Sequence, residues 1–110
     1  MTKMIFAVHN LMINTKKHSV NEISSFTTIH DFNLTPWHNV NNDEILSVVK
    51  NMAKELIGST LFDSPWMNVE YISNDYITTV RYRLYGDANE EPEDKIFDRV
   101  LIITVTPLTI

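Results

Sequence analysis

The chain has 110 residues, of which 44% are hydrophobic and 21% are charged, and its formal net charge is −5. This length is typical of one domain, and the hydrophobic content is well above that of disordered chains, so we expect a single folded domain over residues 1–110. The chain contains no cysteine, which excludes disulfide bonds, thiolate metal sites and a cysteine nucleophile. An acidic chain without clustered Lys and Arg also argues against direct nucleic-acid binding.

The N-terminal residues predict neither a secretory signal nor a membrane anchor. His9 and Asn10 interrupt the apolar run between Met4 and Ile13, and no cleavage site made of small residues follows. No window reaches the roughly 18 consecutive apolar residues that a membrane-spanning helix needs. We therefore expect a cytoplasmic protein with no membrane partner.

Two strands are expected in the first third of the chain. Residues 4–13 are apolar nearly throughout, which is typical of a central strand or of a strand buried on both faces. After a polar turn over 14–19, β-branched and aromatic residues alternate loosely and predict a second strand over 22–29. Pro36 and its polar neighbours then break the pattern, so 31–40 is expected to be a loop.

The strongest local signal is a helix over 42–57. Asn41 is a good N-cap residue, and Glu44 stands three residues later, as in a capping box. Apolar residues then recur at the spacing of one helical face, at Ile45, Val49, Met52 and Leu56. Gly58 follows the last of them, as is typical of the residue that ends a helix.

The residues after Gly58 change to a period of two. Met67, Val69 and Tyr71 alternate with polar residues, and a second alternating run covers 76–84. Asn74 and Asp75 are therefore expected to form the turn of a hairpin. After an acidic segment, residues 97–106 predict a last strand that is apolar on both faces, which is typical of a central strand.

Together these elements predict an α+β fold, a small antiparallel sheet with one helix packed on a face, in the order β-β-α-β-β-β. The apolar stripe of the helix is expected to cover the buried face of the sheet. Large aromatic side chains supply much of the buried area of a small domain. We therefore expect three of them in the core or at its edge, namely Trp37, Trp66 and Tyr71.

An acidic cluster, the strongest charge feature, lies within residues 86–94. Its members are Asp87, Glu90, Glu91, Glu93 and Asp94. A solvated loop is the simplest interpretation, and the functional interpretation is a partner-binding surface for a basic protein. If the acids of the helix lie on the same side, the surface would imitate the phosphates of nucleic acid. A calcium site is not expected, because the D-x-[DN]-x-[DN]-G pattern is missing.

Arg81 and Arg83 lie two residues apart and so share one face of their strand. They are candidate anion-binding residues, especially if the basic turn over 16–18 approaches them. The alternative is a salt bridge, in which Glu70 on the neighbouring strand pairs with one of the two.

The four histidines show no helical metal-binding spacing. His30, Asp31 and His38 would form a divalent-metal site only if the loop brings them together with an orienting second set of hydrogen bonds. The more ordinary interpretation is that these side chains are solvated or cap the backbone. We therefore predict no catalytic residue, no metal and no cofactor.

The leading functional hypothesis is a non-enzymatic protein–protein interaction module, an acidic inhibitor or adaptor that binds a basic protein surface. The small size and Asn/Ile-rich composition suit a viral or mobile-element origin. One alternative is a structural subunit of a homo-oligomer, in which the strand ending at Ile110 or an exposed apolar face pairs with its own copy. The other is a small metal-dependent hydrolase built on His30, Asp31 and His38.

Overall fold

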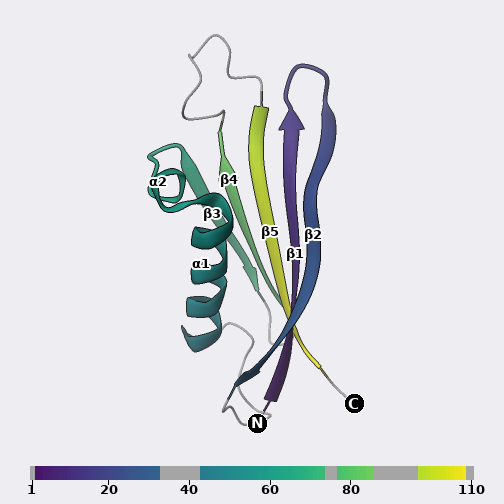
Figure 1. Ribbon diagram of the computed structural model, residues 1–110, viewed down its shortest axis with the longest axis vertical. Coiled ribbons are helices and arrows are strands. Elements are labelled where there is room, and N and C mark those ends of the chain that lie inside the picture. The colour runs from purple at the N-terminus through teal and green to yellow at the C-terminus, as the bar shows by residue number, and fades with distance from the viewer. Residues whose placement is uncertain (1, 33–42, 74–76, 86–96, 109–110) are drawn as a thin grey trace.

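The structure is a computed structural model that describes residues 2–32, 43–73, 77–85 and 97–108. In these ranges the elements are β1 (Thr2–Asn14), β2 (Ser19–Phe32), α1 (Asp43–Ile57), α2 (Ser59–Phe62), β3 (Met67–Ser73), β4 (Thr78–Leu84) and β5 (Phe97–Pro107). The predicted α+β class with an antiparallel sheet is confirmed (Figure 1). The prediction of one helix is incomplete, because the short helix α2 follows α1 directly.

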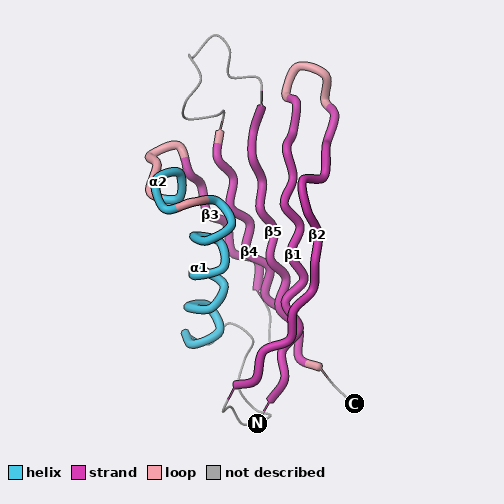
Figure 2. The backbone as a smooth tube through the Cα atoms, in the orientation of Figure 1, coloured by secondary structure: helices cyan, strands magenta, loops and turns pink. Residues whose placement is uncertain are grey.

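The order of the strands in the sheet is β2-β1-β5-β4-β3, and all neighbouring strands are antiparallel. The two strands predicted to be central, β1 and β5, lie side by side in the middle (Figure 2). β5 has β1 on one side and β4 on the other, so it offers no open edge along most of its length. β5 is therefore not an edge strand over these residues, and among the described ranges the edge strands are β2 and β3.

β2 is longer than its own sequence pattern predicted. It runs from Ser19 to Phe32, because it pairs with the whole of β1, from Thr2 opposite Phe32 to Asn14 opposite Ser19. One bulge interrupts this ladder, between Asn10 and Leu11 of β1. The partner strand, rather than local alternation, therefore decides where β2 begins and ends.

The core lies between α1 and one face of the sheet. α1 buries Ile45, Val49, Ala53 and Ile57, while Met52 and Leu56 from the predicted stripe are only partly buried. The sheet contributes alternate residues of its central strands: Met4, Phe6 and Val8 from β1, Val80 and Tyr82 from β4, and Leu101, Ile103 and Val105 from β5. β5 is also apolar on its other face, where Val100 is buried and Ile102 is half-buried.

Gly58 ends α1 as its position predicted. Its N–H donates to the carbonyl oxygen of Lys54 at 3.0 Å, and its φ is 97°, a value that residues with a Cβ rarely adopt. The chain then turns into α2, where Phe62 packs against the ring of Tyr82 with 5.6 Å between the ring centroids. No helix within the described ranges is long and apolar enough to cross a membrane.

Candidate functional site

Several predicted residues lie outside the described residues. These are the acidic cluster at Asp87, Glu90, Glu91, Glu93 and Asp94, the loop residues Trp37 and His38, the N-cap Asn41, and the turn residues Asn74 and Asp75. The predicted role of the acidic cluster in partner binding therefore remains a prediction. The remaining candidates can be located on the sheet.

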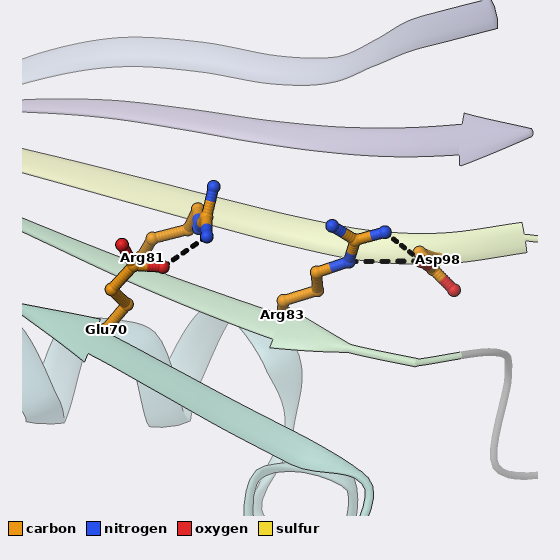
Figure 3. Close-up of polar contacts among 4 residues, drawn as sticks. All are labelled: Glu70, Arg81, Arg83 and Asp98. Carbon is orange, nitrogen blue, oxygen red and sulfur yellow. Dashed lines mark hydrogen bonds and ion pairs between the residues drawn. The ribbon is translucent and has the colours of Figure 1, made fainter. Parts of the chain in front are cut away.

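Arg81 and Arg83 both lie on the face of β4 turned away from the core, since the residues between and beside them are buried. Each guanidinium group has a carboxylate partner on a neighbouring strand (Figure 3). Arg81 pairs with Glu70 of β3, the residue directly opposite it in the ladder. Arg83 donates to Asp98 of β5 through Nε at 3.1 Å and through a terminal nitrogen at 2.6 Å.

The two ion pairs differ in burial. The side chains of Arg81 and Glu70 are 41% and 43% exposed, whereas those of Arg83 and Asp98 are 30% and 7% exposed. The guanidinium of Arg83 also lies 4.7 Å from the centre of the Tyr85 ring, a cation–π contact. The salt bridge to Glu70, the alternative to an anion site, is thus present. An anion at these arginines would have to compete with two carboxylates.

A side chain organises the basic turn between β1 and β2. The side-chain oxygen of Asn14 accepts hydrogen bonds from the backbone N–H groups of Lys16 and Lys17, both at 3.0 Å. His18 completes the turn with a φ of 53°. The lysine and histidine side chains are exposed.

His30 and Asp31 are not brought together, because neighbouring residues of a strand point to opposite faces. His30 Nε2 lies 3.1 Å from Thr28 Oγ1, and its ring contacts Phe6 edge to face. Asp31 instead pairs with Lys3 at 3.0 Å in an exposed salt bridge. Across the ranges that the structure covers, no three metal-ligating side chains form a group. His30 and Asp31 therefore cannot bind one metal ion together in this geometry, as the hypothesis of a metal-dependent hydrolase requires.

A groove that sequence reasoning missed lies between β2 and α1. It has a volume of about 310 Å³ and is lined by Phe26, Thr28 and His30 of β2 and by Met52, Glu55 and Leu56 of α1. Met52 and Leu56 belong to the predicted apolar stripe, yet they are only partly buried against the core. The sequence carried one signal of this groove, the wide apolar face of the helix. One helix cannot cover five strands, so part of that face stays open beside β2.

The edge strand β2 exposes four large hydrophobic side chains. Its exposed large hydrophobic residues are Val20 (57%), Ile23 (48%), Phe26 (38%) and Ile29 (56%). β2 contains no Lys, Arg or Pro, and neither does the other edge strand, β3. The features of β2 that can protect an edge are the exposed residues Glu22 and Asp31 and the bulge at Ile23. Its neighbour in the sheet is β1 alone, so its other row of backbone N–H and C=O groups has no partner strand within the described ranges.

The opposite edge, at β3, also exposes large side chains. Trp66, Tyr71 and Ile72 are 55%, 60% and 60% exposed. The prediction that Trp66 and Tyr71 lie in the core or at its edge is therefore wrong. Trp66 directly precedes the short marginal strand β3 and Tyr71 lies within it, where the helix pair does not cover them. An aromatic type alone cannot reveal that position.

The described residues thus present two exposed strand edges and a groove. Their ion pairs join neighbouring strands of the sheet. Comparisons with protein-family models, with characterised proteins and with solved structures find no match.

Proposed function

We propose that this protein is a non-catalytic protein–protein interaction module that binds a partner chain along the edge of β2. The observation that carries the proposal is the length of this edge strand, 14 residues against 7 in β3, together with its four exposed large hydrophobic side chains. A partner strand added there would satisfy the outward backbone groups, and its alternate side chains would meet those of β2.

The regular part of β2 supports this mode of binding. From Ser24 to Phe32 the strand pairs with β1 without interruption, so its outward backbone groups continue in regular alternation and can pair with a further strand. Phe26 and Ile29 lie within this stretch and are exposed on opposite faces of the sheet. A bound strand would therefore cover apolar surface on both of its sides.

The acidic character of the chain adds a preference for the type of partner. At a net charge of −5, long-range attraction favours a protein with a basic surface. We propose that four residues of the acidic cluster, Glu90, Glu91, Glu93 and Asp94, speed the approach of such a partner, as an inhibitor or adaptor would require. Complementary charge of this kind acts mainly on the association rate and weakens with salt.

The test is affinity capture with matched edge variants. Ile29→Lys places a charge on the β2 edge, and Ile72→Lys places the same charge at an equally exposed position on the β3 edge. We expect Ile29→Lys to lose partners that the unmodified chain and Ile72→Lys retain. Replacing the four acidic-cluster residues by Ser should reduce capture at low salt only.

The opposite outcome would refute the proposal. If Ile29→Lys and Ile72→Lys capture the same partners with equal affinity, β2 is not the binding edge. Circular dichroism of both variants checks that the sheet is intact.

A further inference from the structure

We infer that β2 of a second copy can also occupy the β2 edge, paired antiparallel across a two-fold axis that passes through Phe26. This inference rests on the proposed function only in using the same edge, where the second copy would compete with the basic partner. It names this competing strand, β2 of a second copy of this chain, and its register.

Symmetry restricts the possible registers. Two identical strands in one antiparallel sheet are related by a two-fold axis perpendicular to the sheet, and directly opposite residues point to the same face. In the regular part of β2, Phe26, Thr28 and His30 face the side of α1, because they line the groove with it. The residues between them face the other side. The axis must therefore pass through a residue, and not between two residues.

The sequence of β2 is self-complementary about one such residue. From Ile23 to Ile29 it reads Ile-Ser-Ser-Phe-Thr-Thr-Ile, which is uncharged and palindromic in residue type about Phe26. With the axis at Phe26, the two phenylalanine rings are opposite each other, and Ser25 is opposite the partner's Thr27. Ser24 is then opposite the partner's Thr28. Aromatic pairs and hydroxyl pairs of this kind stabilise antiparallel strands.

Neighbouring registers lack this match. With the axis at Ser25, Phe26 is opposite the partner's Ser24, and with the axis at Thr27 it is opposite the partner's Thr28. In both cases an aromatic ring meets a small hydroxyl side chain. The palindrome does not extend beyond this segment. Glu22 and His30, the first ionisable residues on either side, are each four positions from Phe26 but differ in type.

The ends of the segment also meet favourably. The ladder with β1 has its bulge beside Ile23, the residue skipped between Glu22 and Ser24. Pairing about Phe26 brings Ile29 up to the bulge that contains the partner's Ile23. Both isoleucines are about half exposed in one copy, at 56% and 48%, so the pair covers apolar surface at each end as well as at the centre.

The pairing also changes the groove between β2 and α1. Phe26 forms part of its lining and is 38% exposed. The partner's β2 would continue the sheet beyond this edge and place the partner's Phe26 beside the groove, while the rotation keeps both α1 helices on the same side. The groove is therefore completed by the second copy.

The absence of cysteine from the chain permits a direct test of the register. Opposite residues of antiparallel strands have Cα atoms about 4.5–5.5 Å apart, within the range that a disulfide requires. Under mild oxidation, we expect Phe26→Cys to form a covalent dimer at least about tenfold faster than Ser24→Cys, whose own copy lies roughly 13 Å away along the pair. Ile72→Cys on the other edge is the matched control, and it should remain uncrosslinked.

Sedimentation of the unmodified chain gives the second readout. We expect a species of twice 12.8 kDa at micromolar concentration, a melting temperature that rises with concentration, and loss of both in Phe26→Lys. A monomer at this concentration, or cysteine crosslinks that are fastest away from Phe26, would overturn the inference. If the chain is a monomer but Ile29→Lys still abolishes capture of another protein, the proposed function stands and only the self-pairing is refuted.

Discussion

Replacing Asp98 by Asn should destabilise the fold far more than removing the other carboxylates that pair with cations on the sheet. Asp98 is 7% exposed and accepts two hydrogen bonds from Arg83, at 2.6 and 3.1 Å. An amide keeps the shape but loses the charge, and hydrogen bonds to charged groups contribute roughly 1.5–3 kcal/mol against 0.5–1.5 kcal/mol for neutral ones. Because Arg83 remains 30% exposed to water, Asp98→Asn should cost less than breaking a fully buried ion pair does. We expect a loss of about 2 kcal/mol in the free energy of unfolding.

Urea denaturation followed by tryptophan fluorescence measures this cost, and Glu70→Gln is the matched control. The Glu70 pair is 41–43% exposed, so its loss should cost no more than about 0.5 kcal/mol and should vanish at high salt. For a domain of this size the expected cost of Asp98→Asn corresponds to a melting temperature lower by about 8 °C. Equal costs for the two variants would refute the argument that burial makes the Arg83 pair the stronger one.

Three further predictions concern single residues. Burial raises the pKa of Tyr82 from 10.0 to about 12, with a smaller contribution from Tyr71. The stabilisation of the fold by the neutral phenol is therefore complete below about pH 10. It falls by about 2–3 kcal/mol as the pH rises to 12. Urea unfolding across this range should show the fall, and Tyr82→Phe should reduce it. Gly58→Ala should cost about 1–2 kcal/mol through its φ of 97° alone, since no atom lies within 4 Å of an added Cβ; an unchanged melting temperature would contradict this. Asn14→Ala should cost about 1 kcal/mol by removing the acceptor of two backbone N–H groups, and Asn14→Asp should restore it.

The helix and its end were predictable because their signals are local. The spacing of Ile45 and Val49 and the position of Gly58 act within a few residues of each other, and the structure has α1 over Asp43–Ile57 with Gly58 at its end. The pairing of β3 with β4 was predictable for the same reason, since alternation on both sides of a short connection predicts a hairpin. Its register was not, because Ser73 pairs with Thr78, two residues beyond the position that a two-residue turn at Asn74 and Asp75 would give.

The candidate site was less predictable, because it depends on faces and neighbours. His30 and Asp31 are adjacent in sequence, and a predicted strand that stopped at residue 29 left them in a loop where they were free to converge. The pairing with β1 extends β2 to Phe32 and places the two side chains on opposite faces. Arg83 likewise has its partner in Asp98, which β5 brings alongside β4.

The sequence alone determined the α+β class, the helix, the alternating strands and the apolar character of the two central ones, because backbone hydrogen bonding and side-chain periodicity act over a few residues. Only the tertiary structure decided which strands became edges. β1 and β5 pair although about 90 residues separate them in the chain, and that long-range pairing leaves β2 at the margin with Phe26 exposed. Local alternation did not distinguish the edge strands β2 and β3 from β4, which has a neighbour on each side, and the proposed binding surface follows from that arrangement.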